Sequence, residues 1–243
     1  MKTDIVIPLG RGSIWGDDEE LRYALRGVEK HIANFGKLVI VGMRPKWITN
    51  IIHIPCDDKR GNEWRDYNIF NKIRTAIYNV PDLSDNFLFM NDDHFMLKDY
   101  EAASFPYFFR EYDMIETINK TNKNHAWKTC LSNTRRYLIT NGLPAKMFDT
   151  HTPILYNKHE FLKLNSIDWG KMYGYGIKSL YANSLKIEGT FEKDGKLFPS
   201  EENANRIKGK IYGLPCFSTS PVVPPTQRQI ITDLYPNKSR WEK

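Results

Sequence analysis

The residues best suited to chemistry are two adjacent carboxylates, Asp92 and Asp93, which follow the apolar run 87–90 after one residue, Asn91. Such a run predicts a buried strand, and an open α/β sheet binds its ligands just beyond the carboxyl ends of its strands. Neighbouring carboxylates repel each other unless a cation or a hydrogen-bond donor satisfies them. Mg2+ and Mn2+ are held by oxygen ligands, often one or two carboxylates together with substrate phosphates. The pattern therefore predicts a divalent cation site, although Asn and Asp are also common in solvated turns.

One histidine, His151, is a candidate third metal ligand. It lies in the polar segment 149–153, just before a strand-like stretch at 154–156. Imidazole is a common metal ligand, and the same side chain is also suited to contact a sugar. A lone histidine is more often structural, so the alternative is a residue that only supports the fold.

A second group of residues has the types that hold a nucleotide. The apolar run 5–7 is followed by a glycine-bearing loop and then a helix start, which suits phosphate binding. The loop is neither a GxGxxG fingerprint nor a P-loop. Arginine forms paired hydrogen bonds with phosphate. Residues 68 and 72 are four apart and so share one helix face. For residues 22, 68 and 72 the alternative is a solvated helix face. The candidates are Pro8, Leu9, Gly10, Arg11, Arg22, Asn68 and Lys72.

A basic and aromatic stretch at 120–128 predicts contact with a polyanion. It combines lysines with His125 and Trp127, and Arg135 and Arg136 follow closely. Such cations follow a phosphate backbone, and an aromatic ring stacks on a base. An ordinary solvated loop is the alternative. The net charge of +6, from 35 Lys and Arg against 29 Asp and Glu, permits a polyanionic partner without requiring one.

Alternating strand and helix patterns predict the sheet that positions these residues. Apolar runs closed by Pro, Gly or polar residues indicate strands at 5–7, 38–41, 51–54 and 87–90, and helical periodicity covers about 18–31 and 66–78. This order is typical of a parallel α/β sheet. In the less regular second half we expect strands at 114–118 and 154–156, a loop at 121–128, an extended segment at 215–225, and helices at 129–140, 158–164, 176–185 and 226–234.

These patterns predict one α/β domain over residues 1–243, with a mostly parallel, Rossmann-like sheet flanked by helices and an elaborated C-terminal half. Three cysteines lie far apart without CxxC or CxH spacing, which argues against a zinc cluster or a disulfide framework and favours a reducing compartment. No stretch approaches 18 apolar residues, and the first apolar run is too short for a signal peptide. We therefore expect a soluble cytoplasmic protein without a membrane span.

Several segments together resemble a known family. DIVIPLG, ELRYALRGVEKH, KLVIVG, NIFNKI and FLFMNDDHF, all within residues 4–95, are similar to the glycosyltransferase family predicted to include base J glucosyltransferases and related phage DNA-modifying enzymes. They also resemble the Stealth hexose-1-phosphate transferases, as do the HTP motif at 151–153 and the tail 234–239. The opening strand differs from the Stealth pattern, and the segment 215–220 lacks its second acidic cluster. Both departures favour the glycosyltransferase interpretation.

This resemblance implies a type A (GT-A) nucleotide-sugar glycosyltransferase that moves a sugar, expected to be glucose, from a UDP-sugar to a hydroxymethylated pyrimidine in DNA. Residues 1–95 would bind the donor and residues 96–243 the acceptor, in the host cytoplasm if the protein is phage-encoded. Asp92 and Asp93, with His151, would hold Mn2+ or Mg2+, and the candidate catalytic bases are Asp149 and Glu116. Two alternatives remain open, a Stealth-type hexose-1-phosphate transferase acting on a glycan and a non-catalytic nucleotide- or DNA-binding domain.

Overall fold

A mostly parallel sheet lies at the centre of the molecule. The computed structural model describes residues 2–10, 15–122 and 125–243, so Arg11 lies outside the described residues. The sheet has five strands in the order β4-β3-β1-β5-β9, and every pair is parallel except β5 with β9. The predicted α/β class is therefore confirmed. The strands are β1 (Thr3–Leu9), β3 (Phe35–Gly42), β4 (Ile52–Ile54), β5 (Asn86–Phe89) and β9 (Ile154–Asn157).

Both faces of this sheet are buried. Along β1, Val6 enters one core cluster, while Ile5 and Ile7 enter the cluster on the other side. In β5, Phe89 and Leu88 divide between the two clusters in the same way. A parallel sheet covered on both faces needs apolar side chains at successive positions, which explains why these strands are continuous apolar runs in the sequence.

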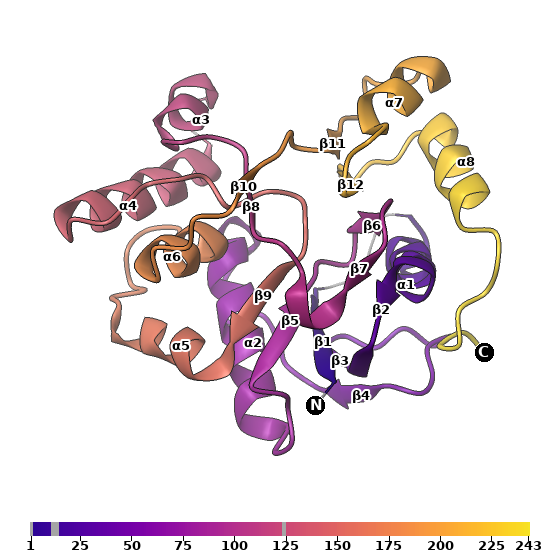
Figure 1. The fold of residues 1–243 in the computed structure, drawn as a ribbon, viewed down its shortest axis with the longest axis horizontal. Coiled ribbons are helices and arrows are strands. Elements are labelled where there is room, and N and C mark those ends of the chain that lie inside the picture. Colours follow the sequence, from indigo (N-terminus) through magenta and orange to yellow (C-terminus); the bar gives the residue numbers. More distant parts are fainter. Residues whose placement is uncertain (1, 11–14, 123–124) are drawn as a thin grey trace.

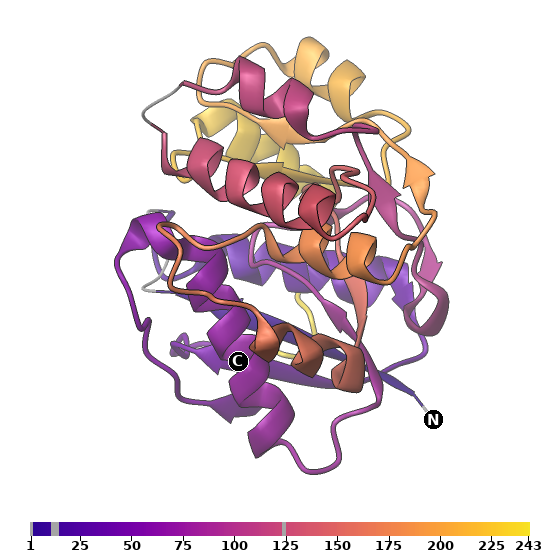
Figure 2. The same ribbon diagram turned by 90° about the vertical axis from the view of Figure 1, so that its left-hand side faces the viewer.

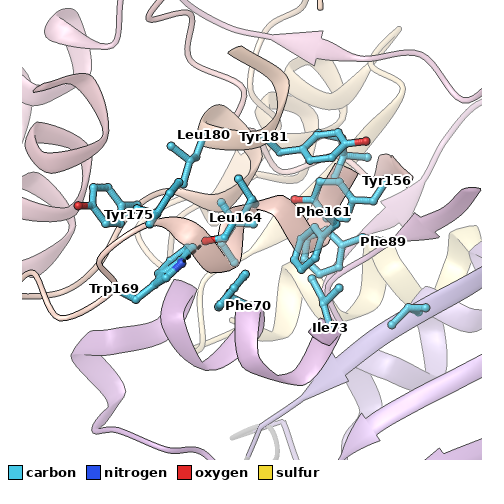
Figure 3. Packing of buried hydrophobic residues seen from close by; sticks show 14 of the residues in the cluster. Phe70, Ile73, Phe89, Tyr156, Phe161, Leu164, Trp169, Tyr175, Leu180 and Tyr181 are labelled. Carbon is cyan, nitrogen blue, oxygen red and sulfur yellow. Dashed lines mark hydrogen bonds between the residues drawn. The ribbon is translucent and has the colours of Figure 1, made fainter. Parts of the chain in front are cut away.

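Helices cover the two faces. α1 (Glu19–His31) packs on the face of Ile5 and Ile7, and α2 (Arg65–Asn79) packs on the face of Val6. Later helices share the α2 side, and Figure 3 shows rings and aliphatic side chains of α2, β5, β9 and the segment 161–181 meeting there. They include α4 (Ala126–Thr140), α5 (Lys158–Lys163) and α6 (Ile177–Ser184).

The strand order reverses between β1 and β5. From β1 the chain crosses by α1 to β3 on one side, and it later returns by α2 to β5 on the other side. In open α/β sheets the connections from two such strands run in opposite directions, which leaves a crevice outside their carboxyl ends. Ligands bind in that crevice. The fold therefore makes the carboxyl ends of β1 and β5 the candidate ligand-binding edge.

Several helices and most of the short strands lie beyond those carboxyl ends, whereas β2 lies at the amino edge, just before β3 (Figure 1). Both ribbon views place α3, α4, α7 and α8 above the sheet (Figures 1 and 2). The helices not yet given are α3 (Ile115–Lys120), α7 (Ala204–Ile211) and α8 (Pro225–Leu234). The paired short strands are β2 (Ile32–Ala33) with β7 (Tyr100–Glu101), β8 (Phe108–Phe109) with β10 (Thr190–Phe191), and β12 (Cys216–Thr219) with both β6 (Phe95–Met96) and β11 (Lys196–Leu197).

The predicted strand at 114–118 is wrong, because this segment begins the helix α3. The Asp113 carboxylate, just before the N-cap residue Met114, accepts a hydrogen bond from the Ile115 N–H at 2.9 Å. Met114 and Ile118 are both buried, and their spacing of four residues suits one helix face. The predicted loop at 121–128 is wrong at its end, where α4 already begins at Ala126. The strand at 154–156 and the helices at 129–140, 158–164, 176–185 and 226–234 are confirmed.

Candidate functional site

Three chain segments meet at the carboxyl edge of the sheet. β1 ends at Leu9, and the Met90 N–H, just past β5, donates to the Val6 carbonyl at 3.1 Å. Phe89 of β5 pairs with Ile154 of the antiparallel β9, so the residues that precede β9 lie at the same edge. The segments 8–10, 91–94 and 149–153 therefore lie at one edge, and 149–153 does so because β9 runs antiparallel to β5, which the sequence does not predict. The segment 91–94 is called the acidic turn below.

Asp92 has an unusual environment. Burial, repulsion from the Asp93 carboxylate and a smaller contribution from Asp18 raise the pKa of Asp92 to about 7. The residue is nevertheless only partly buried, so an approaching solute can reach it. A carboxyl group that shares its surroundings with two other carboxylates is stabilised by a cation or a proton.

Asp93 already has a cationic neighbour. The Lys196 ammonium lies 3.3 Å from its carboxylate and also donates to the Thr219 carbonyl in β12. Lys196 lowers the pKa of Asp92 as well, against the larger effects of burial and of Asp93. The C-terminal half thus supplies one positive charge to the acidic turn.

The segment that precedes β9 holds His151. The Asp194 carboxylate accepts hydrogen bonds from His151 Nδ1 at 2.8 Å and from the His151 N–H at 3.1 Å, and the Arg110 guanidinium pairs with it from the other side. Burial raises the pKa of Asp194, but these hydrogen bonds and charges outweigh burial and hold it well below its usual range. Asp194 therefore stays ionised and fixes the imidazole.

Gly195 allows this segment to approach β12. A Cβ at this position would stand 2.6 Å from the Cys216 carbonyl oxygen and 2.9 Å from the Phe217 Cα. Both atoms belong to backbone, so they cannot move aside cheaply. The absence of a side chain at Gly195 lets Asp194 and Lys196, one on each side of it, reach two different residues of the edge.

Three buried polar atoms in this region have no hydrogen-bond partner within the described ranges. They are His94 Nε2, Ser218 Oγ and Thr219 Oγ1. Phe95 pairs with Phe217 in antiparallel register, so Ser218 stands opposite His94 when the register continues by one residue. Burial lowers the pKa of His94 well below its usual value, with the charge of Lys178 adding to the effect, so this ring is neutral. Buried polar groups normally have a protein or water partner, which makes this a place for a bound water or ligand oxygen.

Asp149 lies at the edge but is engaged in the fold. Its carboxylate accepts hydrogen bonds from the N–H groups of Lys178 and Ser179 at the start of α6, at 3.1 and 3.3 Å. Burial raises the pKa of Asp149 in spite of these bonds. At the start of α2, burial and the charge of Asp149 raise the pKa of Asp66 to about 8. The Asp149 carboxylate thus lies at the edge, but its oxygens are engaged by the N–H groups at the start of α6.

The predicted nucleotide-binding side chains are mostly engaged with other parts of the protein. Lys72 is buried and pairs with Asp58, and Asn68 hydrogen-bonds the backbone of residues 59–60. Arg22 pairs with Glu19 at 2.8 Å and with Glu242 at 3.3 Å. Of this predicted group, the main chain of Pro8, Leu9 and Gly10 lies directly at the edge, and a Cβ on Gly10 would meet nothing within 4 Å.

The predicted acceptor residues lie along α4. His125 caps this helix by accepting from the Trp127 N–H at 3.1 Å, and Trp127 packs against the core. Arg135 forms a two-pronged ion pair with Asp113, at 2.7 and 2.8 Å, while Arg136 is exposed. The candidate base Glu116 is exposed on α3, where it pairs with Lys120 at 3.8 Å. Its ion-pair partner is on the same helix, so no contact links Glu116 to the acidic turn among the residues that the structure describes.

The three predicted metal ligands do not form one coordination set. No group of three or more His, Cys, Asp or Glu side chains among the described residues could hold a metal ion. Asp92 and Asp93 remain adjacent, while His151 is bound to Asp194. A hard cation held by two carboxylates and completed by substrate phosphates fits this arrangement better than an all-protein cage.

Sequence reasoning missed Asp194, Lys196, Lys178 and Arg110. The Lys178 ammonium is buried and donates to the carbonyls of Thr150 and Thr152 at 2.7 Å each, which fixes the segment that carries His151. The one available signal was the order Asp-Gly-Lys at 194–196, in which glycine separates two opposite charges. Such a tripeptide is common in turns, so its pattern alone indicates no partner.

Two surface grooves lie away from this edge. One, of about 390 Å3, is formed by the amino ends of β3 and β4 with Arg240 and Trp241, and the other, of about 440 Å3, lies between α7 and α8. Neither is lined by a predicted site residue.

No known protein-family model matches the chain. Over the part of the chain that the structure describes, no helix is both long and apolar enough to cross a membrane.

Proposed function

We propose that this chain is a metal-dependent glycosyltransferase of the GT-A type, which moves a sugar from a UDP-sugar to a hydroxyl acceptor. The observation that carries the proposal is the position of Asp92 and Asp93, in the turn where β5 ends beside β1 and the strand order reverses. Nucleotide ligands bind at this point in open α/β sheets. A diphosphate and two adjacent carboxylates are both anionic, so a cation between them is needed for both to share one site.

The residues present fit a divalent cation. The pKa of Asp92, raised by burial and by Asp93 to about 7, reports negative charge that a cation would relieve. The Thr219 hydroxyl, which has no hydrogen-bond partner among the residues that the structure describes, belongs to the same residue as the carbonyl that Lys196 binds, beside the same turn. Asp92 and Asp93 would hold the ion, which supplies Lewis-acid assistance to the departing diphosphate when bound.

The protein's own groups complete the donor site. The segment 8–10 lies at the end of β1 with open space at Gly10, while the Leu9 carbonyl already accepts from the Met43 N–H at 3.3 Å. Lys196 can turn from Asp93 toward a phosphate oxygen, since ammonium is a compact donor on a flexible stem.

For the acceptor we propose a hydroxymethylated pyrimidine in DNA, with glucose as the sugar. The net charge of +6 and the exposed Arg136 on α4 support a polyanionic acceptor. Because Arg135 is paired with Asp113, it contributes less positive charge to this surface than the sequence predicts.

A thermal-shift experiment tests the donor site. UDP-glucose with Mn2+ should stabilise the protein by RT ln(1 + [L]/Kd), or about 2.7 kcal/mol at a hundredfold excess over Kd. Asp93→Ala should lose this shift, while Glu202→Gln, at an exposed acid before α7, should keep it. If neither UDP nor any UDP-sugar shifts the parent in the presence of Mn2+, the proposed function is wrong.

The nucleotide product then separates two transferase chemistries. Attack at the anomeric carbon releases UDP, whereas transfer of hexose 1-phosphate releases UMP. The lack of carboxylates at 216–219, the strand that lines the acidic turn, favours UDP. Chromatography of the turnover products distinguishes the two, and UMP in stoichiometry with product would establish the phosphotransferase instead.

A further inference from the structure

Asp194 holds His151 through both its backbone and its ring. Oδ1 of Asp194 accepts from the His151 N–H at 3.1 Å and from Nδ1 at 2.8 Å, and Oδ2 lies 2.9 Å from the same Nδ1. Arg110 binds Oδ2 and also donates to Thr117 on α3 at 3.1 Å. Asp194 is 43 residues from His151 and 84 residues from Arg110 in the sequence, so the orientation of His151 is imposed by the tertiary fold.

These hydrogen bonds determine which nitrogen of the His151 ring can accept a proton. An ionised carboxylate at Nδ1 places the proton of a neutral imidazole on Nδ1 and leaves the lone pair on Nε2. Within the described residues, Nε2 of His151 has no hydrogen-bond partner, and the side chain is 29% exposed. A fixed ring with a free, solvent-reachable Nε2 is the arrangement of a proton acceptor.

His151 also lies at the edge where the donor is proposed to bind. It precedes β9, whose first residue pairs with the last residue of β5. Through the segment 194–196, the carboxylate that orients His151 and the ammonium that binds Asp93 are only two residues apart.

We propose that His151 is the general base of the transfer reaction and that Asp194 is its positioning residue. This inference rests on the proposed function. The acceptor hydroxyl gives its proton to Nε2 of His151 as its oxygen forms a bond to the anomeric carbon. The bond from that carbon to the diphosphate oxygen breaks at the same time, and its electron pair leaves with UDP. A direct displacement of this kind inverts the anomeric configuration.

The geometry favours this role over metal ligation. The residues that the structure describes contain no set of three ligating side chains that would join His151 to Asp92 and Asp93. Magnesium and manganese also prefer oxygen ligands, and the two carboxylates supply these without the imidazole.

The test compares His151→Ala with the parent and with His159→Ala. His159 is a matched control because its side chain is 69% exposed at the start of α5. With UDP-glucose, Mn2+ and a 5-hydroxymethyluracil duplex, His151→Ala should lower kcat about 10²–10⁴-fold, the usual contribution of a general base. Imidazole in the buffer should restore part of the rate. The Mn2+-dependent thermal shift with UDP should stay unchanged, and His159→Ala should behave as the parent does.

Asp194→Asn tests the positioning role with a readout independent of turnover. The neutral amide removes the charge that favours the proton on Nδ1, so 15N NMR of labelled histidines should show His151 changing its tautomer. In Asp194→Asn the KM for UDP-glucose should stay unchanged while kcat falls.

Three results would overturn the inference while leaving the proposed function intact: full activity of His151→Ala, a product with retained anomeric configuration, or loss of Mn2+-dependent UDP binding in His151→Ala, which would make it a metal ligand. If the parent itself neither binds nor turns over UDP-sugars, the proposed function fails, and this inference fails with it.

Discussion

Lys196 places its ammonium 3.3 Å from the carboxylate of Asp93, 103 residues earlier in the chain. This ion pair joins the C-terminal half to the strand end that carries the candidate metal ligands. Both side chains are largely shielded, with 20% and 16% of their surfaces exposed. The Lys196 ammonium therefore neutralises part of the negative charge that a divalent cation would otherwise neutralise.

Lys196→Met should therefore make the acidic turn more dependent on a cation. We expect a loss of about 1–3 kcal/mol in the free energy of unfolding without metal, because Asp93 loses its charged partner. Mn2+ alone should then raise the melting temperature of this variant more than that of the parent at pH 8. Differential scanning fluorimetry measures both effects, and Lys208→Met, at an exposed position on α7, is the control. An equal or smaller Mn2+ shift in Lys196→Met would contradict the assignment of the site.

Gly195 offers a second test of the same connection. An added methyl group would meet the backbone of Cys216 and Phe217 at 2.6 and 2.9 Å, so Gly195→Ala should displace the segment 194–196. Overpacking of this kind costs about 1–3 kcal/mol, and the transfer rate should fall because His151 and Asp93 are both separated from their partners. Chemical denaturation and a transfer assay provide the measurements.

Gly209→Ala is the matched control for that change. A Cβ at Gly209 would meet nothing within 4 Å, and the residue lies inside α7. Alanine is favoured over glycine within a helix by roughly 0.5–1 kcal/mol, so this variant should be as stable as the parent or slightly more stable. Equal stability of the two alanine variants would show that the close approach at Gly195 is unimportant.

The sequence predicts the sheet and its edge well because both depend on local patterns. Continuous apolar runs mark strands buried on both faces, and the acidic pair follows one of them after a single residue. The short strands of the second half are two to four residues long, too short to give a periodic signal. This is why the segment carrying Asp194 and Lys196 could not be placed.

Pairing between distant residues explains the remaining differences. Arg22 is predicted to bind phosphate from its residue type, but Glu242, 220 residues later, pairs with it. Lys72 is likewise paired with Asp58. Nothing local to an arginine or lysine shows whether a carboxylate elsewhere in the chain already neutralises it.

The raised pKa of Asp92 predicts an unusual pH dependence of stability. A carboxyl with a pKa of about 7 in the folded protein and about 3.8 when unfolded binds more protons in the folded state between these values. By linkage, its contribution to stability is present below about pH 4 and is lost as the pH rises to about 7. Asp92→Asn should remove this loss, so the variant should melt above the parent at pH 8 and gain nothing at pH 4. Each kcal/mol corresponds to about 2–4 °C for a chain of this size.

Mn2+ should change that comparison. At pH 8 the ion replaces the proton on the parent's carboxylates and stabilises the parent, whereas Asp92→Asn should respond less because one ligand is no longer charged. Melting curves at pH 4, 6 and 8, with and without Mn2+, test the sign. A parent whose stability rises from pH 4 to 8 by the same amount as that of Asp92→Asn would show that Asp92 titrates as an ordinary carboxylate.

The last prediction separates the two arginines of α4. Arg136 is exposed, whereas Arg135 is held by both oxygens of Asp113. If α4 binds DNA, Arg136→Glu should weaken binding to a 5-hydroxymethyluracil duplex, and the slope of log K against log salt should fall by about 0.9 because one phosphate is no longer neutralised. Arg135→Gln should instead lower the free energy of unfolding, since it breaks the ion pair with Asp113, with a smaller effect on DNA. Fluorescence anisotropy at 50 and 150 mM salt gives the affinities and the slope, and Arg136→Lys, which keeps the charge, should bind nearly as well as the parent. Unchanged DNA affinity in Arg136→Glu, with UDP-glucose still bound, would exclude α4 as the acceptor surface and favour a glycan or small-molecule acceptor.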